Sequence, residues 1–188
     1  MLMLIFSFIL SAFAAPIPAT SSSALIHSPA GVFRSPLGFS LHAGPTTWVQ
    51  SAPPQQMQQL ATLYKSPILN KGVQAALTVR VDQLKDSATL KAYVKTWMKD
   101  YPRFGFDVLA AKPIRVEGQN GFLLDVINRD AAKQLRQVVF LKDRVAVILT
   151  CRDHRDNFEK SVSSCNDIIR TFKWREDKEV PKALQLKD

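Results

Sequence analysis

The chain has 188 residues, of which 46% are hydrophobic and 22% are charged, and this near-average composition excludes wholesale disorder. Its 7 glycines and 2 cysteines exclude collagen-like and disulfide-dense scaffolds. The 25 Lys and Arg residues against 16 Asp and Glu residues give a net charge of +9, which favours anionic partners.

An apolar segment opens the chain at residues 2–14 and is followed by prolines and serines. Crossing a bilayer takes about 20 apolar residues, so this shorter segment predicts a secretory signal peptide over residues 1–14. Ala12-Phe13-Ala14 supplies the small residues of a cleavage site, although no Lys or Arg precedes the apolar segment. We therefore expect an exported protein, periplasmic or secreted, with an uncleaved anchor as the alternative.

The rest of the chain divides by composition into three segments. Residues 15–33 are rich in Pro, Ser and Ala and predict a flexible lead-in. Residues 175–188 mix charges with a proline and show no apolar period, so we expect a frayed tail. Residues 34–174 then form one domain of ordinary size.

The first half of this domain predicts two strands and two helices. Phe39 and Leu41 alternate with polar neighbours, as in a short strand, and residues 77–81 alternate in the same way. The segment at residues 55–64 predicts a short helix that ends before a proline. The strongest helical period runs over residues 90–101, with Ser87 as the expected capping residue.

The second half predicts an antiparallel meander followed by a helix. Asp156 with Glu159 three residues later resembles a capping box, and Phe158, Cys165 and Ile169 recur at helical spacing after it. Cys151 lies at the expected end of the last strand. Four strands connected by short turns precede that helix, at residues 114–116, 122–127, 135–141 and 145–150.

This order of elements predicts an α+β fold in which an antiparallel sheet is covered by two amphipathic helices. The pattern resembles the PsbP-like α/β/α sandwich, which is shared with the Ran-binding Mog family and with exported bacterial proteins of unknown function. The resemblance spans about residues 31–174 and implies a non-enzymatic accessory or binding protein. It is carried by Gly38-Phe39-Ser40-Leu41 with Pro45 and Trp48, by residues 76–81, 90–101, 121–126 and 145–150, and by Phe158, Ile169 and Thr171-Phe172.

The two cysteines allow three interpretations. In an exported protein, a disulfide between Cys151 and Cys165 is favoured, and it would stabilise the fold by about 3 kcal/mol. Two buried free thiols would fit a reducing compartment. Cys151, His154 and Cys165 with Asp153 could instead hold a metal, although zinc sites usually show a second closely spaced pair of ligands.

No motif for catalysis or cofactor binding occurs in the sequence, so we expect no catalytic residue, no cofactor and no metal. His27 lies in the lead-in and His42 near a strand end, without an obvious nucleophile beside either. Asp125 lies within an apolar strand and could be a buried acid, but alternation favours the solvent face for its side chain.

The remaining lead is a row of basic residues on the predicted helix at residues 90–101. Lys91, Lys95 and Lys99 recur every four residues on one face, and Arg103 follows the helix. This row fits either a solvated helix face or a surface for an anionic partner, which could be an acidic envelope protein, lipid headgroups or a polyanionic wall polymer.

Nucleic acid is not expected as a partner, because aromatic residues do not interleave with the basic residues and export removes most nucleic acid from reach. The sequence therefore predicts a non-enzymatic accessory or binding module of the cell envelope. A periplasmic metal-binding or small hydrolytic protein is the alternative. The basic residues outside the helix are Arg129, Lys133, Arg136, Arg144, Arg152 and Arg155.

Overall fold

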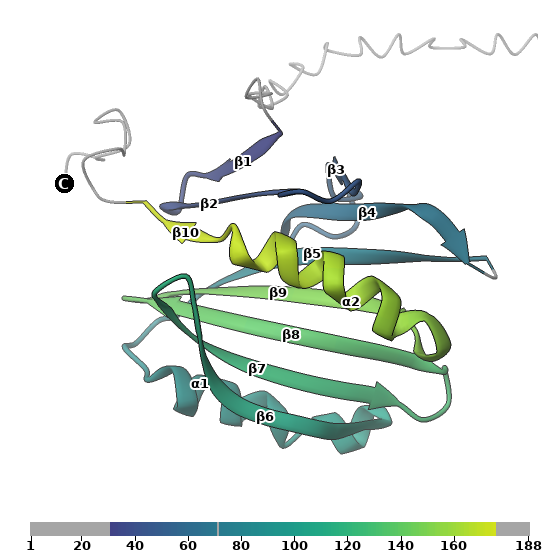
Figure 1. The fold of residues 1–188 in the computed structure, drawn as a ribbon. Coiled ribbons are helices and arrows are strands. Elements are labelled where there is room, and N and C mark those ends of the chain that lie inside the picture. Colours follow the sequence, from purple (N-terminus) through teal and green to yellow (C-terminus); the bar gives the residue numbers. More distant parts are fainter. Residues whose placement is uncertain (1–30, 71, 176–188) are drawn as a thin grey trace, which may run out of the picture.

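The computed structural model describes residues 31–70 and 72–175 (Figure 1). It is an α+β fold with two antiparallel sheets, two α-helices and one short 3₁₀ helix among these residues. In chain order the elements are β1 (Val32–Ser35), β2 (Phe39–His42), β3 (Val49–Ser51), β4 (Leu60–Asn70), β5 (Val73–Gln83), α1 (Leu90–Met98), η1 (Tyr101–Phe104), β6 (Phe106–Val116), β7 (Gln119–Asn128), β8 (Lys133–Lys142), β9 (Val145–His154), α2 (Arg155–Arg170) and β10 (Lys173–Trp174).

The main sheet has seven strands in the order β3-β4-β5-β9-β8-β7-β6. Its longest connection joins β5 to β6 through α1 and η1, which places β9 beside β5 in the centre of the sheet. β6 is an edge strand, because it pairs only with β7. A smaller sheet, β1-β2-β10, joins the start of the domain to its end, where Trp174 pairs with Phe39.

Each face of the main sheet carries its own group of buried side chains, because neighbouring residues of a strand point to opposite faces. Val138 and Val139 are adjacent in β8 and belong to different groups. In Figure 1, α2 lies in front of the sheet and α1 behind it. We name the two groups the α2-side core and the α1-side core.

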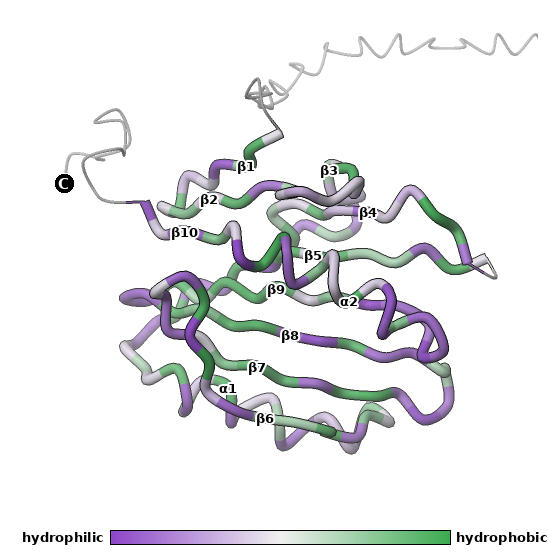
Figure 2. The backbone as a smooth tube through the Cα atoms, viewed as in Figure 1, coloured by the Kyte–Doolittle hydropathy of each residue, from purple (hydrophilic) through white to green (hydrophobic). Residues whose placement is uncertain are grey.

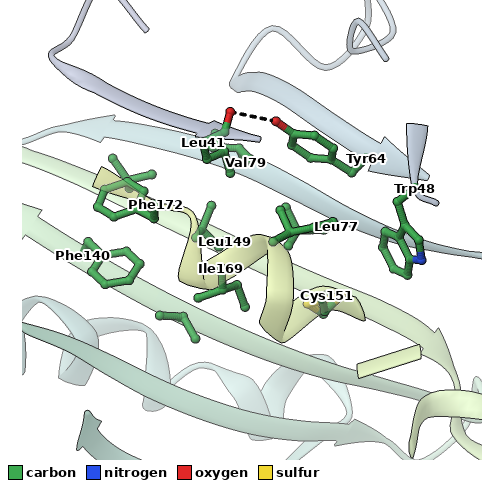
Figure 3. Close-up of a cluster of buried hydrophobic side chains, with 14 of the residues drawn as sticks. Leu41, Trp48, Tyr64, Leu77, Val79, Phe140, Leu149, Cys151, Ile169 and Phe172 are labelled. Atoms are coloured by element: carbon green, nitrogen blue, oxygen red, sulfur yellow. Dashed lines mark hydrogen bonds between the residues drawn. A yellow bond between two sulfur atoms is a disulfide. The ribbon is translucent and has the colours of Figure 1, made fainter. Parts of the chain in front are cut away.

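The α2-side core is the larger of the two and is rich in aromatic residues. Phe172 stacks on Phe140 with ring centroids 4.2 Å apart, and both side chains are fully buried. The hydroxyl of Tyr64 donates a hydrogen bond of 3.2 Å to the carbonyl of Leu41, which ties β4 to the smaller sheet (Figure 3). This hydrogen bond gives the buried phenol a partner, as burial of a polar group requires.

The α1-side core is smaller and is formed by one face of α1 against strands β7, β8 and β9. Tyr93 and Val94 are the buried residues of the helix, and they pack on Leu124, Val139 and other apolar residues of the sheet. Figure 2 shows hydrophilic and hydrophobic residues alternating along α1. This alternation is the pattern of a helix that covers a sheet with one face and meets solvent with the other.

The helix predicted at residues 55–64 is wrong. β4 begins at Leu60 in that segment and runs for 11 residues, with Leu63 and Tyr64 paired to Thr78 and Leu77 of β5. A glutamine-rich sequence is compatible with a helix locally, but pairing with a long neighbouring strand and burial of Tyr64 override that preference.

The predicted capping residues of both helices are also wrong. The side chain of Thr89, not Ser87, accepts a hydrogen bond from the Ala92 amide at 3.2 Å, and α1 therefore begins at Leu90. For α2, the Nδ1 atom of His154 accepts from the Asp156 amide at 3.3 Å, so Asp156 lies inside the first turn. In both helices the cap is the residue directly before the first helical residue.

Several strands are longer than their apolar periods predict. β9 continues past Cys151, its expected end, to His154, and β6 begins at Phe106 rather than at Ile114. β1 begins at Val32, within the expected lead-in, and Phe33 of β1 packs against the α2-side core. The signal peptide predicted at residues 1–14 and the part of the predicted tail from residue 176 lie outside the described residues.

Candidate functional site: the basic face of α1

In the structure, Cys151 of β9 and Cys165 of α2 form the disulfide that the sequence favours. Their Cα atoms are 6.0 Å apart, within the range that a disulfide needs, and both residues are buried. The bond fixes the middle of α2 to the centre of the sheet and leaves neither sulfur as a free thiol. Within the described ranges, no group of three or more His, Cys, Asp or Glu residues is placed to hold a metal ion.

The two histidines of the described domain both accept hydrogen bonds from backbone amides. Nδ1 of His42 accepts from the Gly44 amide at 3.0 Å, and Nδ1 of His154 caps α2. Over residues 31–70 and 72–175, no hydroxyl donates to either ring, so no nucleophile–base pair is formed there. His27 lies outside the described residues.

Asp125 does not point freely to solvent, as its position in an alternating strand predicted. It forms an ion pair with Arg136, in which two guanidinium nitrogens donate to the two carboxylate oxygens at 2.8 Å each. The side chains of Asp125 and Arg136 are only 15% and 22% exposed. The prediction failed because this face of β7 is the one that α2 partly covers, and Arg136 also donates to Asn166 of α2 at 3.3 Å.

The pKa of Arg136 and the geometry of its ion pair with Asp125 are those of a structural contact. The hydrogen bonds to Asp125 raise the pKa of the Arg136 guanidinium, against the opposing effect of burial. A charged Arg in two parallel hydrogen bonds to a carboxylate gives a well-defined geometry across the β7–β8 ladder. Asp125 is therefore held as a paired carboxylate between strands and is not an acid poised for catalysis.

Two open grooves lie on the described surface. One, of about 310 Å³, lies beside α2 and includes Arg136 and Arg170, both of which are paired with aspartates. The other, of about 570 Å³, lies on the opposite face between residues 56–60, Thr78 and Arg152. Neither groove is lined by a histidine or a cysteine.

A polar network beneath α1 fixes the helix on the sheet. Arg80 of β5 pairs with Asp82 at 3.0 Å and lies over the Trp97 ring, with its guanidinium carbon 5.5 Å from the ring centroid. The Tyr93 hydroxyl donates to Asp82, and the Tyr101 hydroxyl donates to Gln137. The sequence places Arg80 and Asp82 on the polar face of a strand, but their partners come from α1 and could not be named in advance.

The two tyrosines of this network stay protonated well above neutral pH. Burial raises the pKa of Tyr101 to about 12. Burial, together with hydrogen bonding to Asp82, raises the pKa of Tyr93 further. Both phenols therefore act as hydrogen-bond donors: Tyr93 holds α1 with that face turned to the sheet and the opposite face turned to solvent, and Tyr101 holds η1.

That opposite face carries the basic residues expected from the sequence. Lys91, Lys95 and Lys99 are all exposed, and their spacing of four residues places them on one side of α1. Among the described residues, no carboxylate forms an ion pair with any of the three lysines. Arg103 in η1 is 80% exposed and lies 3.8 Å from Asp100. We call Lys91, Lys95, Lys99 and Arg103 the basic face.

An exposed apolar patch lies beside the end of the basic face, and sequence reasoning missed it. It consists of Phe104, Val108 and Leu109, which are 67%, 36% and 56% exposed. Phe104 ends η1, and the other two belong to the first half of β6. A weak signal was present, because Phe104 directly follows Arg103, the last of the basic residues, and lies beyond the predicted helix, outside any apolar period. We call these three residues the apolar patch.

Among the described residues, no helix is long and apolar enough to cross a bilayer. No protein-family model matches the chain, and no curated protein matches it in sequence.

Solved structures, in contrast, match well. Cyanobacterial PsbP from Synechocystis aligns over 84% of this chain and 99% of its own, with 13% identity and a TM-score of 0.54. The fold is PsbP-like. A Pseudomonas aeruginosa protein of unknown function aligns over 70% of this chain and 99% of its own, with 17% identity and a TM-score of 0.56. A Bacteroides thetaiotaomicron protein aligns over 79% of this chain and half of its own, with 12% identity and a TM-score of 0.54. At such identities the PsbP-like fold is shared, and fold does not imply function.

Proposed function

We propose that this chain is a non-enzymatic, exported binding module of the cell envelope that engages an anionic partner through the basic face of α1. The observation that carries the proposal is the row of exposed lysines with no acidic partner in the described domain. Other basic residues are partly neutralised, since Arg129 pairs with Asp107 and Arg136 pairs with Asp125. The basic face therefore concentrates positive charge that is free to meet an anionic surface.

The scaffold we propose is the α/β/α sandwich of the PsbP-like fold, with one helix on each face of the main sheet. Its support is that alternate residues of β8 enter different cores, one with α2 and one with α1. In such a scaffold α1 is held by its apolar face and by the Arg80–Asp82–Tyr93 contacts. A helix held in this way displays its outer face in a fixed geometry, which suits recognition.

Export is supported by two independent features. Residues 1–14 have the length and the small residues of a signal peptide. The disulfide between Cys151 and Cys165 is the kind of bond that persists in an oxidising compartment. We therefore place the protein in the periplasm or outside the cell.

The absence of an enzyme activity is likewise a proposal. Its support is that both described histidines accept backbone hydrogen bonds and that Asp125 is held by Arg136. The metal-binding alternative from the sequence would need Cys151 and Cys165 as thiolate ligands, and both sulfurs are in the disulfide.

A charge-reversal experiment tests the basic face. The double variant Lys91→Glu/Lys95→Glu changes the net charge by four units, and so does the control Lys142→Glu/Lys173→Glu, whose lysines are exposed on β8 and β10. Binding of a fluorescent poly-glutamate is measured for both at low and high salt. We expect the α1 variant to lose affinity by about tenfold or more and the control by less than about threefold, with both differences shrinking at high salt.

Equal losses in the two variants would contradict the proposal, because the polyanion would then respond to total charge and not to the face of one helix. Unchanged binding in the α1 variant would contradict it as well.

A further inference from the structure

We propose that the anionic partner is a lipid bilayer, and that the basic face and the apolar patch together bind an anionic membrane surface. This inference rests on the proposed function of the basic face and names its partner. It adds a second element to recognition, because Phe104, Val108 and Leu109 would enter the boundary between headgroups and acyl chains while the lysines remain among the headgroups.

The apolar patch differs from the scattered exposed residues that every protein carries. Its three members lie within six residues of sequence, across the junction of η1 and β6. That junction is held in place by the Tyr101 and Phe106 rings, whose centroids are 6.2 Å apart, and by the Tyr101 hydrogen bond to Gln137. The patch therefore projects from a fixed part of the fold, and its exposure has no packing role within the domain.

Charge around the patch is complementary to an anionic surface. Arg103 directly precedes Phe104, and Lys99, the C-cap residue of α1, ends the row of lysines five residues before it. Of the nearby acids, Asp100 lies 3.8 Å from Arg103 and Asp107 pairs with Arg129, while the carboxylate of Asp130 lies beside Gly105. The row Lys91, Lys95 and Lys99 remains free of ion pairs within the described domain. Basic residues next to exposed apolar side chains are typical of proteins that bind anionic bilayers at the interface.

A protein partner fits this surface less well. The exposed edge of β6 is the obvious place for a partner strand, but strand addition needs a regular ladder with free amides. β6 contains Pro113, which has no amide hydrogen, and its register shifts between Val108 and Ala110. These features, with Lys112 and Arg115 on the same strand, are those by which edge strands resist pairing. A soluble polyanion would use the lysines but would leave Phe104 and Leu109 in water.

Vesicle binding tests the proposal with the protein isolated from the cell envelope. The probes are vesicles of phosphatidylglycerol and phosphatidylcholine in equal amounts and vesicles of phosphatidylcholine alone. We expect co-sedimentation at least about tenfold stronger with the anionic vesicles, since each lysine near such a surface contributes a factor of about five. Equal binding to the two kinds of vesicle would overturn the proposal.

A matched pair of variants separates the patch from general hydrophobicity. Phe104→Ser/Leu109→Ser removes the two most exposed members of the patch. Ile68→Ser/Leu69→Ser removes equally exposed residues from the tip of the β4–β5 hairpin, the green end of β4 in Figure 2. We expect the patch variant to bind anionic vesicles about tenfold more weakly and the hairpin variant to change by less than about twofold.

A fluorescent residue at position 104 shows whether the apolar patch itself enters the bilayer, even if another segment of the chain also binds the vesicles. The fluorescence of Phe104→Trp is measured with anionic vesicles containing brominated lipid, relative to the unsubstituted protein, and compared with Ile68→Trp. Quenching is expected at position 104 and not at position 68.

If neither position is quenched and the patch variant binds like the unsubstituted protein, the bilayer proposal is wrong. The bilayer proposal fails but the proposed function of the basic face survives if Lys91→Glu/Lys95→Glu still weakens poly-glutamate binding, because the partner is then a soluble anion or an acidic protein. Both proposals fail if that charge reversal has no effect on either probe.

Discussion

The two faces of the main sheet both place apolar side chains from β8 and β9 in their cores, but they carry different kinds of interaction. The α2 face contains the disulfide, the Phe140–Phe172 stack and the paired charges of Asp125 and Arg136. The α1 face has a smaller apolar core and an outer helix surface of unpaired lysines. We therefore expect the α2 face to supply most of the stability, while the α1 face carries the proposed binding surface.

The largest effect on stability is expected at the centre of the α2-side core. Phe172→Ala should lower the free energy of unfolding by about 4 kcal/mol, because a fully buried aromatic ring stacked on Phe140 leaves a cavity. Urea denaturation measures the change. Phe104→Ala is the matched control. Its free energy of unfolding should fall by less than about 0.5 kcal/mol, because this ring is exposed. Similar losses in the two variants would show that the α2-side core does not dominate stability.

The disulfide gives the next largest effect. Cys151→Ala/Cys165→Ala should destabilise the domain by about 3 kcal/mol, since the unfolded chain gains the freedom that the bond removes. The intact mass of the native protein should be two hydrogens lower than that of the reduced protein. Ready alkylation of both sulfurs in unfolded but unreduced protein would show that the bond is absent.

Sequence reasoning predicted those parts of the fold in which one apolar period dominates a segment. The α1 helix, the meander of β7, β8 and β9, and the apolar face of α2 each have such a period, and the structure contains all of them. The PsbP-like fold itself followed from this order of elements and is confirmed by similarity to solved structures. β4 was missed because its first residues are glutamine-rich and its strand character comes from pairing with β5.

In the candidate site, as in the fold, some features could be predicted from the sequence and others could not. The basic face could be predicted, because helical spacing alone places Lys91, Lys95 and Lys99 together. The burial of Asp125 could not, since it depends on Arg136 and on the position of α2, both fixed by tertiary structure. The apolar patch was missed for a related reason: an exposed Phe and an exposed Leu look like core residues in a sequence.

The tyrosines under α1 predict how the α1 face responds to pH. The folded state raises the pKa of Tyr101 to about 12, mainly through burial, while the unfolded state has the ordinary value near 10. The unfolded state therefore loses this proton first, and stability that is fully present below pH 10 is lost between about pH 10 and 12.

Urea midpoints measured across this range provide the check. Tyr101→Phe, which cannot ionise, should show a shallower decline than the unsubstituted protein. An equally steep decline in the variant would mean that Tyr101 does not contribute to the alkaline loss.

The smallest effect on stability is expected for Lys91→Glu/Lys95→Glu, the double variant that should weaken the binding of anions. Lys91 is in the first turn of α1 and Lys95 in the last, so each Glu substitution meets an opposite end of the helix dipole. Lys91→Glu should stabilise the helix by a few tenths of a kcal/mol, and Lys95→Glu should destabilise it by about as much. The double variant should therefore keep the free energy of unfolding within about 0.5 kcal/mol of the original. Urea denaturation of the single and double variants measures these differences. A loss above about 1 kcal/mol in the double variant would show that the lysines support the fold, and weaker binding by that variant could then no longer be attributed to the basic face alone.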